Sequence, residues 1–292
     1  MRSIAVLNQK GGVGKTTTAV NLSAALAAAG HHVCLIDLDP QAHATLHLGQ
    51  TPGQDSLSIY QVLLGDASLA AARRQVEQNL SLVGSHIDLA AAEVELAGVI
   101  GREVILHDKL AELLTTSPDH QTPDQHPPDY LLIDCPPSLG ILTLNALAAV
   151  DEVLLPLQPH FLALHGLSKL MQTIDLVSRR LNSRLKLTGV VLCQYESATR
   201  LAGEIAHDVA EFFDRQRARP TPWSAAHIFQ TRIRRNIRLA EAPSFGQSIF
   251  QYEPGSNGAE DYRQLAEEVL GATAVGGTGQ RAIASRPVPA SR

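Results

Sequence analysis

The sequence predicts an α/β protein whose twisted, mostly parallel sheet carries helices on both faces. Short apolar runs alternate with longer segments of helical pattern along most of the chain. The run at 32–37, H-V-C-L-I-D, shows no polar–apolar alternation, which is typical of a strand covered on both faces. A preceding strand at 4–7, a helix and this second strand form a right-handed crossover unit, the usual building block of such a sheet.

Composition narrows the class of protein. The 292 residues suit one large α/β domain or two small ones, and 45% of them are hydrophobic. The first strand starts almost at Met1 and no apolar run is long enough for a bilayer, so we expect neither a signal peptide nor a membrane span. The three cysteines form no C-x-x-C pair, which favours a reducing cytoplasm. Because the net charge is −5, any nucleic-acid binding must come from a local basic patch.

The strongest motif is a glycine-rich loop between the first strand and the first helix. Glycines let backbone N–H groups close on phosphate oxygens, and the helix N-terminus adds its dipole to the same anion. Lys15 is expected to reach the β- and γ-phosphates of a nucleotide, and the Thr16 hydroxyl is expected to bind Mg²⁺. The predicted nucleotide contacts of this loop are Lys10, Gly11, Gly12, Val13, Gly14, Lys15, Thr16 and Thr17.

The remaining elements follow in order. The first helix covers 16–29 and stops at Gly30, and the strand at 32–37 ends in Asp37-Leu38-Asp39, on the edge where open α/β sheets bind ligands. A strand at 130–133 ends in Asp134, whose carboxylate is expected to lie near the Mg²⁺ held by Thr16. Further helices are predicted at 59–64, 88–114 (weak near Gly98 and Gly101), 164–181, 202–215 and 260–270. Further strands are predicted at 80–83, 152–156 and 187–193, and short edge strands at 228–229 and 248–250. An exposed loop is predicted at 117–129.

The glycine loop also identifies a resemblance. The standard phosphate loop would have glycine at Gln9, whereas Lys10–Thr16 matches K-G-G-x-G-K-[ST] in full. The chain therefore resembles the deviant-loop family of ParA/Soj and MinD ATPases over residues 1–270, which we expect to form one P-loop ATPase domain. The resemblance implies that Lys10 crosses to the nucleotide of a partner subunit. It also supports Asp39, within D-L-D-P-Q, as the residue that orients or activates the attacking water. Asp37 is expected to hold the site in place without contacting the reacting groups.

A late stretch at 230–249 carries two further expectations. It looks like the family signature in which a backbone segment and an asparagine hold adenine. Asn236 matches that asparagine. Arg234 stands where the family usually has proline, so only the main chain of Arg234 is expected to contact the adenine. ParA-type dimers bind DNA non-specifically through surface basic residues, and Arg235 matches the arginine of the late motif. The predicted DNA contacts are Arg200, Arg232, Arg235 and Arg238; the alternative for this cluster is a solvated charged face.

The resemblance implies a cytoplasmic, nucleoid-associated ATPase that uses ATP and Mg²⁺ and dimerises when ATP is bound. Its implied task is partitioning of a chromosome or plasmid origin with a ParB-type partner that, with DNA, stimulates hydrolysis. One alternative is positioning of a cargo other than DNA. Another is a MinD-like membrane regulator of division, although the basic tail expected to be disordered at 271–292 lacks an amphipathic stripe. A third is a metabolic or electron-transfer enzyme on the same fold, which the cysteine count opposes.

Overall fold

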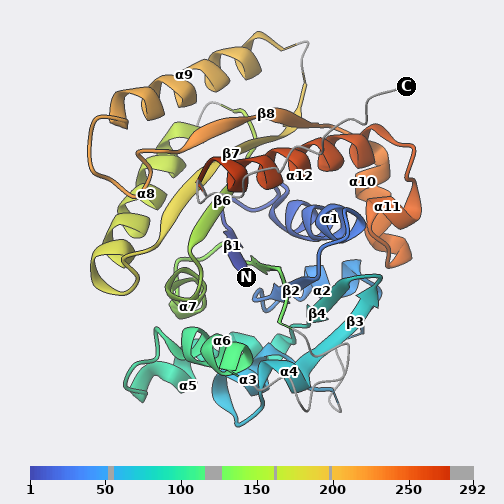
Figure 1. Ribbon diagram of the computed structural model, residues 1–292, viewed down its shortest axis with the longest axis vertical. Coiled ribbons are helices and arrows are strands. Elements are labelled where there is room, and N and C mark those ends of the chain that lie inside the picture. Colours follow the sequence, from blue (N-terminus) through green and yellow to red (C-terminus); the bar gives the residue numbers. More distant parts are fainter. Residues whose placement is uncertain (52–55, 116–126, 161–162, 197–198, 277–292) are drawn as a thin grey trace, which may run out of the picture.

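The computed structural model describes residues 1–51, 56–115, 127–160, 163–196 and 199–276. Within these residues, eight strands form one sheet in the order β3-β4-β2-β5-β1-β6-β7-β8 (Figure 1). Strand β3 runs antiparallel to β4, and all other neighbours are parallel. The strands are β1 (Arg2–Val6), β2 (Val33–Asp37), β3 (Arg73–Glu77), β4 (Leu80–Val83), β5 (Tyr130–Asp134), β6 (Glu152–Leu157), β7 (Lys186–Tyr195) and β8 (His227–Arg234).

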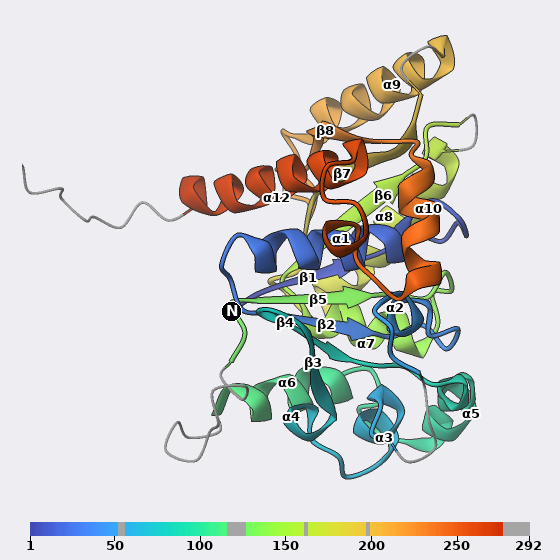
Figure 2. The same ribbon diagram turned by 90° about the vertical axis from the view of Figure 1, so that its right-hand side faces the viewer.

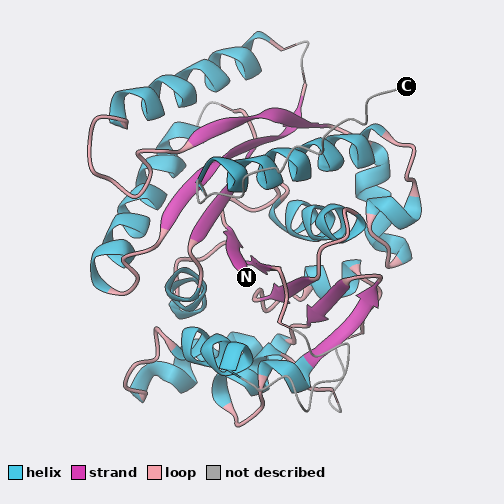
Figure 3. Ribbon diagram, viewed as in Figure 1, coloured by secondary structure: helices cyan, strands magenta, loops and turns pink. Residues whose placement is uncertain are grey.

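Helices cover both faces of the sheet, which confirms the predicted fold class (Figures 1 and 3). One face carries α1 (Lys15–Ala28), α2 (His43–His47), α10 (Ile237–Glu241), α11 (Ile249–Tyr252) and α12 (Asn257–Gly276). The other face carries α3 (Ile59–Leu64), α4 (Leu69–Ala72), α5 (Ala92–Glu95), α6 (Ile105–Thr115), α7 (Ile141–Ala149), α8 (Ala163–Arg180) and α9 (Arg200–Gln216).

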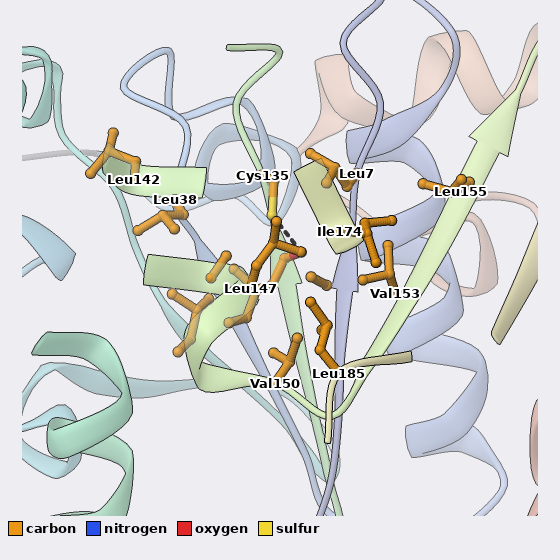
Figure 4. Close-up of a cluster of buried hydrophobic side chains, with 14 of the residues drawn as sticks. Leu7, Leu38, Cys135, Leu142, Leu147, Val150, Val153, Leu155, Ile174 and Leu185 are labelled. Carbon is orange, nitrogen blue, oxygen red and sulfur yellow. Dashed lines mark hydrogen bonds between the residues drawn. The ribbon is translucent and has the colours of Figure 1, made fainter. Parts of the chain in front are cut away.

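The sheet divides the core into two clusters of buried apolar side chains. Along β5, Leu131 and Ile133 belong to the cluster under α7, while Leu132 belongs to the cluster under α1. Successive strand side chains point to opposite faces, so a strand covered on both sides must be apolar at every position. Figure 4 shows part of the first cluster, where Cys135 lies fully buried beside Leu147 and Leu7. Cys135 is thus a packed thiol.

Two element predictions differ from the structure. The helix expected at 88–114 is interrupted at 99–104, next to the expected weak stretch, where Gly101 has a left-handed φ of 74°. Before the interruption lie the 3₁₀ turns at Ile87–Ala91 and Leu96–Gly98 and the short α5 in place of one regular helix, and after it lies α6. The strand expected at 248–250 is instead the start of α11, after a 3₁₀ turn at Ala242–Phe245. There the backbone N–H of Ile249 donates to Asn21 Oδ1 on α1 at 2.8 Å, which holds this segment on α1 and away from a sheet edge.

Other elements differ in extent. Strand β3 was not predicted, because its sequence R-R-Q-V-E is mostly polar and it lies at an edge of the sheet, where it pairs on one side. Strand β8 is longer than the expected 228–229. Helix α12 continues to Gly276, so residues 271–276 of the expected tail are helical. The rest of that tail, 277–292, and most of the loop expected at 117–129 lie outside the described residues. Within the described ranges, none of the helices has the length and apolar character needed to cross a bilayer.

Candidate functional site

The glycine loop joins the carboxyl end of β1 to the start of α1, at the edge of the sheet where β2 and β5 also end (Figure 2). Gly14 occupies the N-cap position of α1 with a left-handed φ of 93°, and no side chain of the described residues caps the helix. Gly12 also has a left-handed φ, of 73°. Other residues would be strained at both positions. The uncapped first turn presents backbone N–H groups, which is the arrangement that binds phosphate.

Lys15 places a buried cation inside this loop. Lys15 is only 8% exposed, and its Nζ donates to the carbonyl oxygen of Lys10 at 3.3 Å. Burial lowers the pKa of the Lys15 ammonium, and the charges of Asp134 and Asp39 oppose that shift. The side chain is therefore held between the loop backbone and the two acidic strand ends. It can exchange the Lys10 carbonyl for a phosphate oxygen.

Asp134 ends β5 and is fully buried. Neither of its carboxylate oxygens accepts a hydrogen bond of normal geometry from the described residues, although the Thr16 hydroxyl lies nearby. Burial raises its pKa well above the usual range, the charge of Asp37 adds to that effect, and Lys15 counteracts it. A buried carboxylate without donors costs free energy unless a cation compensates it. The hydroxyl of Thr16 and the oxygens of Asp134 form a donor set that fits Mg²⁺.

Replacing Asp134 by asparagine is expected to stabilise the nucleotide-free protein by about 1 kcal/mol, a rise in Tm of about 2 °C. Since its pKa is raised in the fold, the native state binds more protons than the unfolded chain above pH 3.8. The free energy of unfolding of the wild type therefore falls as the pH rises above 3.8, and that of the variant should fall less steeply. The variant should also lose the Mg²⁺-dependent part of its ATP affinity. Thermal unfolding from pH 4 to 8 measures the first effect and calorimetry the second.

The exposed Asp66→Asn variant is the control for this prediction. A lower Tm for Asp134→Asn than for that control would show that the Asp134 carboxylate stabilises the fold by itself. The assignment of Asp134 to a cation would then lose its basis.

Asp37 and Asp39 have different surroundings. Asp37 Oδ2 accepts from the backbone N–H and the hydroxyl of Thr45 at 2.8 and 2.7 Å, and Oδ1 accepts from the backbone N–H of Asp39 at 3.2 Å. Burial raises the pKa of Asp37 to about 6, against the effect of the Thr45 hydrogen bonds. Asp39 is 8% exposed and uses Oδ1 to accept from the backbone N–H of Gln41 at 2.9 Å. Asp37 thus fixes α2 to β2, and Asp39 is the carboxylate placed to act near Lys15.

A cavity of about 360 Å³ opens beside the loop. Its apolar walls and its position next to Gly14 and Thr17 suit a nucleoside base. Asn236 lines it and uses Oδ1 to cap α10, accepting from the backbone N–H of Arg238 at 2.8 Å. The lining residues are Gly14, Thr17, Cys193, Gln194, Ile233, Arg234, Arg235, Asn236, Ile237, Leu239, Ala240 and Tyr262.

The Arg234 side chain is bound to α12. Its Nε donates to Asp261 Oδ1 at 3.0 Å, Asp261 is 4% exposed, and the backbone N–H of Arg234 donates to Oδ2 of the same carboxylate at 2.9 Å. The guanidinium therefore fixes β8 to α12. The adenine contact predicted for Arg234 stays a prediction for its main chain.

Three of the four predicted DNA-binding arginines have partners among the described residues. Arg232 stacks over the Tyr195 ring at 4.4 Å from the centroid and donates to its hydroxyl. Arg235 donates to Glu196 at 3.0 Å, and Arg238 donates to Glu241 at 2.8 Å. Arg200 is exposed at the first position of α9. The neighbouring acids reduce the local positive charge, so this cluster is less basic than its sequence suggests.

Lys10 lies in the loop between β1 and α1 and is exposed. Its backbone N–H donates to Asn8 Oδ1 at 3.0 Å, and Asn8 Nδ2 donates to the carbonyl of Pro156 at 2.7 Å. The backbone at Lys10 is thus fixed to the end of β6, while the ammonium is accessible to another molecule.

Sequence reasoning missed Gln194, whose side chain contacts the loop. Its Nε2 donates to the carbonyl oxygen of Gly12 at 2.7 Å. No local motif surrounds Gln194, and the two residues are 182 positions apart. A fold was needed to bring them together.

Comparison with known proteins gives consistent matches. Residues 1–187 match the AAA domain family. The sporulation initiation inhibitor protein Soj of Bacillus subtilis is 42% identical over 267 residues, covering 91% of this chain and 97% of the relative. The chromosome partitioning protein ParA of Myxococcus xanthus is 42% identical over 270 residues, covering 92% and 88%.

Solved structures share the whole fold. Cobyrinic acid a,c-diamide synthase from Mycobacterium smegmatis, with bound ADP and magnesium, has a TM-score of 0.75 at 36% identity, covering 94% of this chain and 96% of the other. Apo McdA from Cyanothece has a TM-score of 0.76 at 20% identity, covering 92% and 99%, and supports the fold alone.

Proposed function

The chain belongs to the ParA/Soj family of P-loop ATPases, whose relatives include chromosome partitioning proteins, and from this premise we propose that it is an ATP-dependent dimerising ATPase. In this proposal the ATP-bound dimer binds DNA non-specifically on the nucleoid in the cytoplasm. A ParB-type partner and DNA stimulate hydrolysis, and the cycle partitions a chromosome or plasmid origin. The observation that carries the proposal is the buried Lys15 beside Asp134, whose carboxylate accepts no hydrogen bond of normal geometry from the described residues, with Lys10 exposed at the same loop.

Each residue has a defined task at the site. The loop amides from Gly11 to Thr17 and the Lys15 ammonium bind the phosphates and balance their charge. Thr16 and Asp134 hold Mg²⁺, which supplies charge neutralisation at the phosphate oxygens when bound. Asp39 orients the attacking water. Lys10 contributes its charge to the nucleotide of the second subunit, which makes two bound subunits more stable than one.

The geometry near the base cavity supports DNA binding through Arg235 and Arg238. Arg235 lines the cavity and Arg238 lies three residues further on, in α10; both residues are exposed, and each is paired with an acid that solvent can reach. Ion pairs at the surface contribute little free energy. DNA phosphates can therefore replace Glu196 and Glu241 as partners at small cost.

Replacing Arg235 by glutamate is expected to weaken binding to random-sequence DNA about tenfold at low salt, because the variant cannot bind a phosphate there and adds a repulsive charge. The slope of log affinity against log salt should become shallower by about one, since one phosphate fewer is neutralised. Glu196→Gln should have the opposite effect on affinity, since it frees Arg235. Gel shifts with an ATP analogue at several salt concentrations measure both.

The matched control is Arg179→Glu on α8. Arg179 and Arg235 have similarly exposed side chains, 74% and 78%, and each pairs with one acid at 3.0 Å. If Arg235→Glu binds DNA no more weakly than Arg179→Glu, the arginine cluster is a solvated face and DNA binding must be sought elsewhere.

The overall test measures phosphate release from ATP with the protein alone, with DNA, and with DNA and a ParB-type protein. Stimulation by both additions supports partitioning. Hydrolysis without any effect of DNA favours another cargo, and co-sedimentation with vesicles favours a membrane regulator. Because one solved relative is named as a diamide synthase, ATP consumption that requires an amide donor and a carboxylate acceptor would favour a biosynthetic activity instead.

A further inference from the structure

Gln194 occupies an irregular position at the end of β7. Cys193 pairs with Ile233 of β8 and Tyr195 pairs with Arg234, so Gln194 is the extra residue of a β-bulge. Its φ is 51°, a left-handed value that is strained for a residue with a side chain. Bulges of this kind redirect side chains near functional sites.

The redirected side chain connects two strands to the glycine loop. Gln194 Nε2 donates to the carbonyl oxygen of Gly12 at 2.7 Å, and Gln194 Oε1 accepts from Nε2 of Gln158, which follows β6, at 3.0 Å. Gln194 also lines the cavity assigned to the base. Although the side chain is exposed, both ends of its amide are in use.

We propose that Gln194 is a positioning residue that holds the phosphate-binding loop ready for a nucleotide, an inference that rests on the proposed function. In a trans peptide the carbonyl of Gly12 and the N–H of Val13 point in opposite directions. By holding the Gly12 carbonyl toward β7, Gln194 turns the Val13 N–H away from β7 and into the loop. The N–H is then a fixed donor for a phosphate oxygen and needs no reorientation on binding.

The chemistry requires an amide at this position. The side chain must donate to Gly12 and accept from Gln158 at the same time, and a glutamine does both. A glutamate would keep the hydrogen bond with Gln158 but would place an acceptor against the Gly12 carbonyl. A glycine would remove both hydrogen bonds and relieve the strained φ.

The test compares Gln194→Glu, Gln194→Gly and Gln158→Leu by calorimetric titration with ADP and by thermal unfolding without nucleotide. Gln194→Glu and Gln194→Gly should each bind ADP about tenfold more weakly, as expected when one hydrogen bond is removed. Gln158→Leu keeps the hydrogen bond to Gly12, so its affinity should fall about twofold. Gln194→Gly should unfold at the same or a higher temperature than the wild type, because a strained backbone is relieved.

Weaker binding together with unchanged or greater stability is the signature of positioning, since a residue that only supports the fold would lower both. Wild-type affinity in both Gln194 variants would overturn this inference and leave the proposed function intact. A wild-type protein that binds neither ADP nor an ATP analogue would overturn both.

Discussion

Lys15→Ala is expected to weaken ATP binding by about 100-fold, because charge-assisted hydrogen bonds to phosphate contribute up to about 3 kcal/mol. The lysine is buried and faces Asp134 and Asp39, so its removal also takes away a cation that offsets the charges of these acids. The nucleotide-free variant should therefore unfold at a lower temperature than the wild type. Calorimetric titration at a temperature where the variant remains folded measures the loss of affinity.

Lys10→Ala is the matched control in the same loop. The Lys10 side chain is exposed, and its carbonyl, which receives the Lys15 hydrogen bond, is kept in the variant. We expect near wild-type affinity for one nucleotide per subunit and loss of the ATP-dependent doubling of mass in light scattering. Unchanged ATP affinity in Lys15→Ala would refute the assignment of the loop as a phosphate site.

Asp39→Ala is expected to lower hydrolysis at least about 100-fold while ATP affinity is retained, the usual size of effect for a group that orients or activates a nucleophile. The ATP-bound dimer should then persist, because the step that releases the subunits is blocked. Light scattering after addition of ATP and Mg²⁺ should show a doubled mass that does not decay. Single-turnover phosphate release measures the chemical step directly.

The Asp39→Asn variant separates charge from structure. Its carbonyl oxygen can still accept from the backbone N–H of Gln41, so the turn after β2 is preserved. If Asp39→Asn hydrolyses ATP at the wild-type rate while Asp39→Ala does not, the carboxylate only shapes this turn. Equal loss in both variants supports a role for the charge. Adding Lys10→Ala to either variant should abolish the persistent dimer.

The central part of the fold and of the site could be predicted because it is encoded by neighbouring residues. Strand β1, the glycine loop and α1 follow one another without interruption, and the parallel sheet brings Asp134 to the same edge. The apolar runs of β2 and β5 identify buried strands without a structure. These features depend on local pattern and on one topological rule, so the sequence is sufficient for them.

Predictions failed where a hydrogen-bonded partner, and not the segment's own sequence, decided the element. The polar β3 became a strand through pairing with β4, although its sequence carries no strong strand pattern. The segment beginning at Ser248 became helical where Asn21 of α1 binds its backbone. In both segments the local preference is weak, so pairing with the neighbouring strand β4 in one and with the distant Asn21 in the other outweighs it.

The sequence by itself determined the α/β class, the phosphate loop and the acidic strand ends. Only the tertiary structure decided how the residues around them are used: Arg234 binds Asp261, Asp37 binds Thr45, and Gln194 binds Gly12. The first group is written in contiguous motifs with fixed spacing. The second depends on which side chains of the folded chain come within hydrogen-bond distance, and the pair Gln194–Gly12 spans 182 positions that no local pattern connects.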